Sequence, residues 1–252
     1  QTATITVGDA PVAVAFTRDG LKAYVANGGD RTLSIIDVAT NTVLGTTSAL
    51  GVTPTLVDVE VSASGAAVYV SGRAPDGVYR YSTSGAGSWT TTIAAGADPG
   101  ALALAPDGAT LYVANGTPQT VTTITTATDV VSTTFAVPGQ AQAIAVDPTG
   151  QTVYVGTSAS GAASLVARAN GATSSIGAAS SAGGVFSITV KPDGSAIAAL
   201  ATTRVDVQST TGTTLGALTG TALRAVAICP AVAPDAPSAV KTTPGDTAVD
   251  VA

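Results

Sequence analysis

The 252-residue sequence contains no histidine and no methionine, and it has a single cysteine, Cys229. The absence of histidine excludes a Ser-His-Asp triad and a histidine-bound metal. One cysteine excludes an internal disulfide and a cysteine-based zinc site, and we expect Cys229 to be a small buried apolar residue. No phosphate-binding or dinucleotide-binding glycine motif is present, because the glycine-rich stretches lie between predicted strands rather than before a helix. The sequence therefore predicts no cofactor and no metal site.

Charge is also scarce, because Asp, Glu, Lys and Arg together make up only 10% of the residues. The ten Lys and Arg residues are scattered singly and the net charge is −6, so no basic surface for nucleic acid is predicted. No apolar run approaches the roughly 20 residues that a membrane-spanning helix needs. The lack of methionine is typical of a mature or trimmed chain whose export signal has been removed, and of a subcloned fragment.

The sequence does contain a repeat. In each copy a tight turn ends in a glycine, and these glycines follow one another at intervals of 42 to 45 residues: Gly20, Gly65, Gly108, Gly150 and Gly194. Each repeat has a run of small and branched apolar residues before the glycine, and a strand of the Tyr-Val type and a Thr-rich stretch after it. Repeats of about 40–50 residues with four short strands each are typical of a β-propeller. We therefore predict an all-β propeller that occupies residues 1–230.

Each repeat is predicted to form one four-stranded blade with strands a to d, from the inside outwards. In the third repeat the predicted strands are 101–105, 110–115, 120–126 and 130–137. Equivalent strands are predicted in the other four repeats, and Gly at the end of each a–b turn supplies the positive φ that the turn needs.

Two further segments resemble parts of a blade. Residues 2–7 resemble an outer strand, and residues 223–228 resemble an inner strand. Because a closed ring exposes no long sheet edge, we predict that both belong to one shared closing blade, which gives six blades. Residues 231–252 would then supply the missing strands (238–243 and 247–252) or form a Pro-rich linker. Seven blades, or five blades and an incomplete one, are the alternative counts.

The first repeat, with 11–20, 23–27 and 33–41 as its segments, resembles the YVTN-type β-propeller repeat, which is known from secreted and surface-layer proteins. The resemblance is strong in the first and third repeats and weaker in the others, and it covers about residues 3–228. Residues 236–252 separately resemble the opening strands of a fibronectin type III domain. The resemblance to the YVTN-type repeat implies an extracellular or cell-surface location.

Two acidic residues interrupt the pattern of the inner strands. Five and seven positions before each turn glycine the other repeats have Ala, Ser or Thr, whereas the second repeat has Glu60 and Asp58. Alternation along a strand places both carboxylates on one face. We expect them to reach a water-filled central channel, where they would either be solvated or bind a cation or a partner such as Arg224.

A second candidate surface is the face formed by the d–a and b–c loops, called here the top face. The first three repeats bring six charged residues there, whereas the later repeats bring Ser, Thr and Gly. The candidate partner-binding residues are Asp9, Asp30, Arg31, Arg73, Asp76 and Asp98. This lopsided charge indicates either a solvated rim or a docking site for a protein.

Together these features predict a non-catalytic extracellular module that serves structure or binding in a surface layer, a filament or an adhesin. Its expected partners are proteins or cell-surface components, including further copies joined through the terminal strands. The alternative is a small-ligand- or cation-binding enzyme or sensor with its site at the channel mouth, and the enzyme classes in question are a propeller lyase, lactonase or dehydrogenase. Fold by itself does not decide between them.

Overall fold

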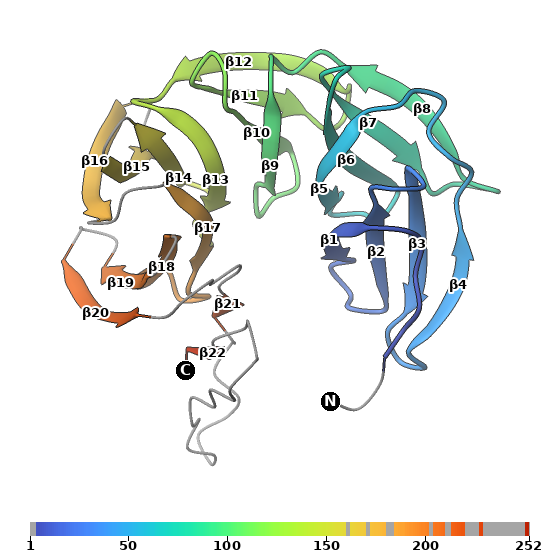
Figure 1. The fold of residues 1–252 in the computed structure, drawn as a ribbon, viewed down its shortest axis with the longest axis horizontal. Coiled ribbons are helices and arrows are strands. Elements are labelled where there is room, and N and C mark those ends of the chain that lie inside the picture. The colour runs from blue at the N-terminus through green and yellow to red at the C-terminus, as the bar shows by residue number, and fades with distance from the viewer. Residues whose placement is uncertain are drawn as a thin grey trace. The chain divides into compact units, whose positions relative to one another are not determined.

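The computed structural model describes residues 4–159, 162–169, 172–179, 184–201, 204–209, 213–219, 227–228 and 250–251. All regular elements in this part of the chain are β-strands (Figure 1). The chain divides into two compact units, residues 1–135 and 136–252, and each unit is described by itself.

The first unit contains three four-stranded antiparallel sheets, each formed by strands that are consecutive in the sequence. Blade 1 consists of β1 (Pro11–Phe16), β2 (Lys22–Asn27), β3 (Thr32–Asp37) and β4 (Thr42–Thr46). Blade 2 consists of β5 (Thr55–Val61), β6 (Ala67–Arg73), β7 (Gly77–Ser82) and β8 (Ser88–Ile93). Blade 3 consists of β9 (Pro99–Leu104), β10 (Thr110–Asn115), β11 (Thr120–Thr125) and β12 (Val130–Ala136).

The second unit contains two more sheets of the same kind and one short strand pair. Blade 4 consists of β13 (Gln140–Val146), β14 (Thr152–Ala159), β15 (Ala162–Ala169) and β16 (Ala172–Ala179). Blade 5 consists of β17 (Val185–Val190), β18 (Ala196–Ala201), β19 (Arg204–Ser209) and β20 (Thr214–Thr219). The pair consists of β21 (Ala227–Ile228) and β22 (Asp250–Val251), which run parallel.

The predicted all-β class and the four-stranded blades are confirmed, and in the third repeat the ends of the predicted strands differ from the observed ends by at most two residues. The sequence did not predict a β-bulge that recurs in all five inner strands. It lies between Leu56 and Asp58 in β5 and at the equivalent place in the others. A bulge sharpens the local twist of a strand, which suits the twisted sheet of a blade.

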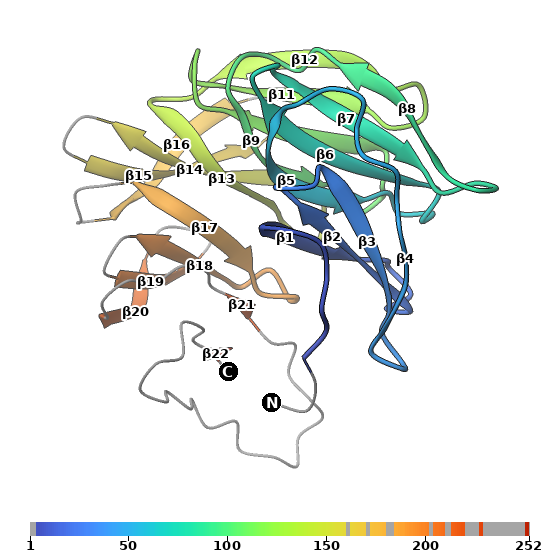
Figure 2. The same cartoon turned by 45° about the vertical axis from the view of Figure 1, so that its right-hand side comes forward.

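Neighbouring blades within a unit pack face to face through apolar side chains. Tyr24 and Leu33 of blade 1 share a buried cluster with Val59 and Val68 of blade 2, and blades 2 and 3 share a second cluster. Figure 2 shows β1–β3 stacked beside β5–β7. In the second unit, Tyr154 of blade 4 packs with Ile197 of blade 5. These clusters are the core of each unit, because burial of apolar surface is the main stabilising contribution.

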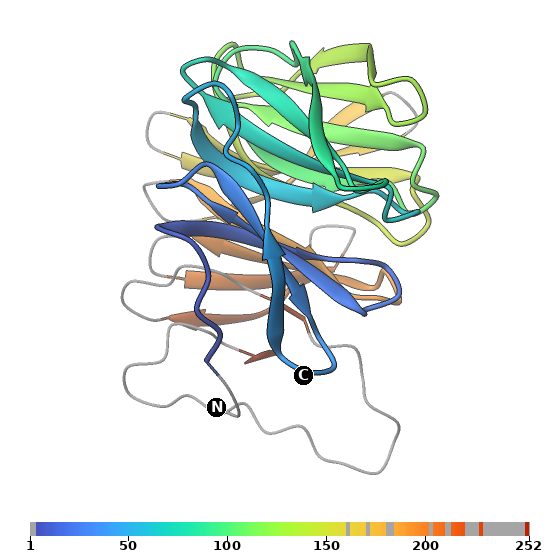
Figure 3. The same ribbon diagram turned by 90° about the vertical axis from the view of Figure 1, so that its right-hand side faces the viewer.

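The closing-blade prediction is not supported in its details. Residues 4–7 form no strand, although Ile5 and Val7 pack against Ala23, Val25 and Ile36 of blade 1. This segment runs beside blade 1 before it enters β1 (Figure 3, dark blue). In the predicted blade the strand 238–243 lies between the strands 223–228 and 247–252. In the structure β21 and β22, which belong to the two outer segments of this set, pair directly with each other. The segments 231–249 and the predicted strand 238–243 lie outside the described residues, so the closure of the ring stays a prediction.

Candidate functional site

Asp58 and Glu60 lie on β5, the innermost strand of blade 2, and both are half-buried. Asp58 is paired with Ser71 of β6 and Glu60 with Tyr69, so both follow the bulge and share one side of the strand. On β9, the inner strand of blade 3, the two equivalent residues are alanines. This placement agrees with the position that the sequence predicted on the inner strand.

The two carboxylates contact β9. The backbone N–H of Leu102 donates to Oδ2 of Asp58 at 2.8 Å, and the N–H of Leu104 lies 3.4 Å from Oε1 of Glu60. The other carboxylate oxygens accept the N–H of the following residue, Val59 for Asp58 at 2.8 Å and Val61 for Glu60 at 3.3 Å. The inner edge of a sheet presents N–H groups without a strand partner, and these side chains satisfy two of them.

Ser71 adds a third polar link at the same place. Its hydroxyl donates to the carbonyl oxygen of Gly100 at 2.6 Å and accepts the N–H of Asp58 at 3.1 Å. Blades 2 and 3 are thus joined by polar contacts along their inner strands as well as by their apolar cluster.

Burial raises the pKa of Asp58 to about 6 and that of Glu60 to about 7. The charge of Asp58 raises the pKa of Glu60 further, and the backbone N–H donors act in the opposite direction on both groups. Groups that titrate near neutrality can take up and release protons under ordinary conditions, which is the property a general base needs.

The expected surroundings of this pair are only partly described. Arg224, the predicted partner, lies outside the described residues. Within the described part of the chain, no cluster of three or more Cys, Asp or Glu residues has the arrangement of a metal site. All four carboxylate oxygens accept backbone N–H groups, two from β9 and two from β5, and the sequence did not predict these contacts.

The six charged residues of the top face form two separate groups. In blade 1, the N–H of Asp9 donates to Oδ2 of Asp30 at 2.7 Å. The backbone of the adjacent Arg31 bonds to Asn27 and Leu50, so this loop is held by main-chain contacts. No hydrogen bond or ion pair between described residues joins this group to the other one.

The second group lies where blades 2 and 3 meet. Nε of Arg73 lies 2.6 Å from Oδ1 of Asp98 and also donates to the carbonyl oxygen of Pro99 at 3.2 Å. Oδ2 of Asp76 accepts the N–H of Asp98 at 3.1 Å. These side chains fix the loops of the top face, and Arg73 and Asp98 are still partly exposed, with 43% and 37% of each side chain accessible.

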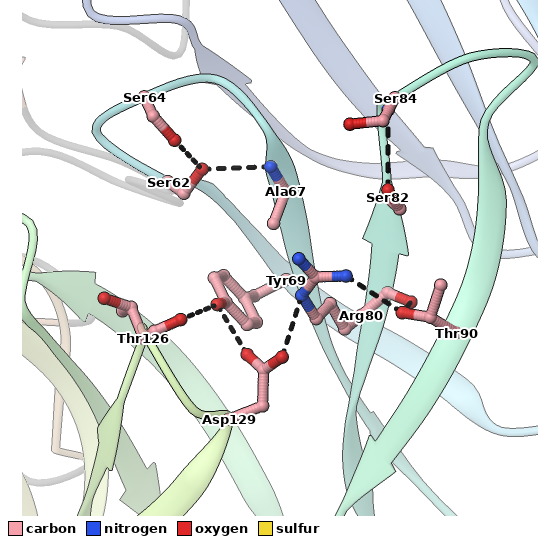
Figure 4. A network of polar contacts seen from close by, with 10 residues as sticks. All are labelled: Ser62, Ser64, Ala67, Tyr69, Arg80, Ser82, Ser84, Thr90, Thr126 and Asp129. Carbon is pink, nitrogen blue, oxygen red and sulfur yellow. Dashed lines mark hydrogen bonds and ion pairs between the residues drawn. The ribbon is translucent and has the colours of Figure 1, made fainter.

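A third polar group was missed from the sequence. The hydroxyl of Tyr69 donates to Oδ1 of Asp129 at 2.8 Å, and Nε of Arg80 lies 3.0 Å from Oδ2 of the same carboxylate (Figure 4). Nη1 of Arg80 donates to Thr90 at 3.0 Å. Burial and the Asp129 carboxylate raise the pKa of Tyr69 to about 12. The signal in the sequence that could have revealed this group is Arg80, because the equivalent residue of the first repeat is the apolar Ile35.

Comparison with known proteins agrees with this architecture. Residues 1–129 match the family described as "Lactonase, 7-bladed beta-propeller". The chain belongs to this family. Its described residues contain five complete blades, and the alternative counts stated from the sequence were seven blades or five blades and an incomplete one. A search of curated proteins finds no match.

Solved structures show the same fold at low sequence identity. The chain resembles hydrazine synthase from Kuenenia stuttgartiensis with a TM-score of 0.70 and 20% identity, and the match covers 83% of this chain and 65% of that one. A protein of unknown function from Desulfotomaculum acetoxidans gives a TM-score of 0.71 and 20% identity, covering 87% and 73%. At this identity the likeness concerns the fold alone. Among the described residues there is no helix of sufficient length and apolar character to cross a membrane.

Proposed function

We propose that the chain is a non-catalytic propeller module that binds protein or cell-surface partners outside the cell. The observation that carries this proposal is the use of the candidate acidic side chains in contacts within the protein. The carboxylates of Asp58 and Glu60 accept backbone N–H groups of β9, and those of Asp76 and Asp98 join the loops of blades 2 and 3. Such contacts stabilise a rigid surface for binding.

The location outside the cell is supported by the sequence. The repeat resembles the YVTN-type repeat of secreted and surface-layer proteins. Residues 236–252 resemble the opening strands of a fibronectin type III domain, which is common in extracellular proteins. With 10% charged residues and net charge −6, the chain offers little repulsion to assembly and no basic surface for nucleic acid. Further copies of the chain are therefore included among the proposed partners.

The test is binding of the labelled protein to intact cells and to isolated envelopes of the source organism. We expect saturable binding that Arg31→Glu weakens, because this change reverses a charge on the top face. Lys191→Glu is the matched control, since Lys191 lies next to the a–b turn of blade 5, at the opposite end of the strands. Binding that is absent, or that both reversals reduce equally, would contradict the proposal.

A second candidate function is hydrolysis of a cyclic ester, and the raised pKa values of Asp58 and Glu60 are the observation that favours it. The family name points to lactones, and a carboxylate that titrates near neutrality can activate water as a general base. A panel of lactones should then be hydrolysed by the purified chain, and Glu60→Gln should abolish the rate. Equal rates for the wild type, Glu60→Gln and buffer would rule this function out.

A further inference from the structure

A pocket of about 540 Å³ opens between blades 1 and 2, at the end of the sheets where the a–b and c–d turns lie. Blade 1 contributes Lys22 and Tyr24 from β2 and Ile35 from β3 to its lining. Blade 2 contributes Tyr81 from β7 and Gly87 from the c–d turn. All of these residues belong to the first unit, and none belongs to the sites discussed above.

The equivalent place between blades 2 and 3 is filled by the Tyr69–Asp129–Arg80 group of Figure 4. The strand registers establish the equivalence. Tyr24 pairs with Ile35 in blade 1 as Tyr69 pairs with Arg80 in blade 2. One blade farther along, the next c–d turn ends at a residue with positive φ, Gly87 (71°) in blade 2 and Asp129 (57°) in blade 3.

The carboxylate that receives the tyrosine hydroxyl between blades 2 and 3 thus has no counterpart between blades 1 and 2. There a glycine stands in place of the aspartate and an isoleucine in place of the arginine. The space next to Gly87 is taken instead by the side chain of Tyr81, since a Cβ at Gly87 would overlap the Tyr81 hydroxyl, and this side chain lines the pocket.

Tyr24 is the equivalent of Tyr69, but none of the described aspartates accepts a hydrogen bond from its hydroxyl. Tyr24 is only 3% exposed, and its hydroxyl makes no hydrogen bond with any described residue. Burial, and to a smaller extent the nearby Tyr81, raises the pKa of Tyr24. Tyr81 is 5% exposed, and its own hydroxyl likewise has no hydrogen-bond partner in the described part of the chain. Neither hydroxyl oxygen is among the fully enclosed polar atoms that lack a partner, so each can donate a hydrogen bond to a ligand that enters the pocket.

A cation and an apolar wall complete the lining. Lys22 shares the face of β2 with Tyr24, and its ammonium group forms no ion pair among the described residues. Leu21 and Leu44, 60% and 56% exposed, line the mouth. Asp19 also lines it and opposes an anion, although its Oδ1 accepts the Thr17 hydroxyl at 2.6 Å and the N–H of Leu21 at 3.0 Å.

We propose that this pocket binds a small carboxylate with a short apolar tail. The ligand carboxylate accepts hydrogen bonds from the hydroxyls of Tyr24 and Tyr81 and pairs with Lys22. Its tail packs against Leu21 and Leu44. This site is independent of the proposed binding at the top face.

The experiment is calorimetric titration of the full chain with hexanoate, with hexanamide as the neutral control. We expect hexanoate to bind and hexanamide to bind at least about tenfold more weakly, because a hydrogen bond to a charged group is worth about tenfold or more in affinity. Tyr24→Phe and Lys22→Met should each weaken hexanoate by about tenfold. Asp19→Asn should tighten it by about twofold or more, since it removes a like charge.

Two further variants guard against misfolding. A Cβ at Gly45, which pairs with Ile35, meets no atom within 4 Å, so Gly45→Leu should fill the pocket and abolish binding without disturbing the fold. Tyr79→Phe is the control, because the Tyr79 hydroxyl donates to Pro75 at 2.7 Å, away from the pocket. Failure of hexanoate to bind, equal binding of hexanamide, or unchanged binding to Gly45→Leu would each overturn the proposal.

Discussion

At the scale of single residues, Asp58 and Glu60 make the stability of the protein depend on pH between about pH 4 and 7. Their pKa values are raised from 3.8 to about 6 and from 4.5 to about 7, so the folded state holds these protons to a higher pH than the unfolded chain. Their contribution to stability is complete below about pH 4 and is lost as the pH rises through about 7. We expect the free energy of unfolding to fall over this range and Glu60→Gln to flatten the fall, as chemical denaturation at successive pH values would show.

Asp107→Asn is the matched control for this profile, since it removes an acid from an exposed a–b turn. Its slope between about pH 4 and 7 should equal that of the wild type. A Glu60→Gln profile that is parallel to the wild type would show that folding does not raise the pKa of Glu60.

Asp129 supports a second prediction, because it accepts from Tyr69 and pairs with Arg80, and only 22% of its side chain is exposed. Asp129→Ala removes the ion pair of Arg80 and the shorter hydrogen bond of Tyr69, whose hydroxyl keeps only a contact of 3.4 Å with the carbonyl oxygen of Thr126, and it should lower the free energy of unfolding by about 2 kcal/mol. Asp129→Asn keeps an acceptor for Tyr69 and tolerates the positive φ, so it should cost about 1 kcal/mol. Equal costs for the two variants would mean that the Tyr69 hydrogen bond contributes nothing.

Asp58 and Asp129 also show what a sequence can reveal about a site. Asp58 stands out because its equivalents on the other inner strands are small residues, so counting back from the turn glycine finds it. Asp129 ends a turn with a φ of 57°, where Asp is expected on conformational grounds, and this hides its second role. The partners of both, Leu102 and Tyr69, depend on how one blade packs on the next, which no local pattern encodes.

At the scale of elements, the a–b turns of the first three blades adopt one conformation in different surroundings. Gly20 and Gly108 have φ of 70° and 74°, but a Cβ at Gly20 meets no atom within 4 Å, whereas one at Gly108 overlaps Cβ of Ala63 in the neighbouring turn. Gly20→Ala should cost about 1–2 kcal/mol through backbone strain alone. Gly108→Ala should cost about 1–3 kcal/mol more, because overlap is added to strain.

A rescue separates the two contributions. Ala63→Gly in the Gly108→Ala background removes the overlapping atom and should recover the additional loss, leaving the cost of Gly20→Ala. Thermal and denaturant unfolding of the variants would measure these differences. No recovery on adding Ala63→Gly would contradict the proposed contact between the turns.

The elements themselves could be predicted well, because glycine turns and alternating apolar residues determine where short strands begin and end. The bulges could not, since an extra residue such as Val57 leaves no mark in a run of small apolar residues. The prediction that Asp58 and Glu60 share one face was still correct. Both residues lie after the bulge, and the alternation was counted back from the turn glycine that follows them.

At the scale of the whole molecule, the number of blades depends on strands that have no partner within their own repeat. Residues 2–7 have the composition of an outer strand, yet their described part, 4–7, is not in one. Composition alone cannot show this difference, because a strand exists only where a neighbour accepts and donates its backbone hydrogen bonds. The family is seven-bladed, and the six-blade ring therefore stays a prediction.

The N-terminal segment offers the last test, since it either stabilises its own chain or adds to another. Ile5 and Val7 pack against Ala23, Val25 and Ile36 of blade 1, so replacing both by serine should lower the free energy of unfolding by about 2 kcal/mol. Thr6→Ala, at the exposed position between them, should have little effect. Because the contact lies within one chain, the loss should be the same at all protein concentrations, as unfolding across a dilution series with mass photometry would establish. If the serine variant instead retained its stability as a monomer and lost only oligomers, the segment would act by strand donation between copies.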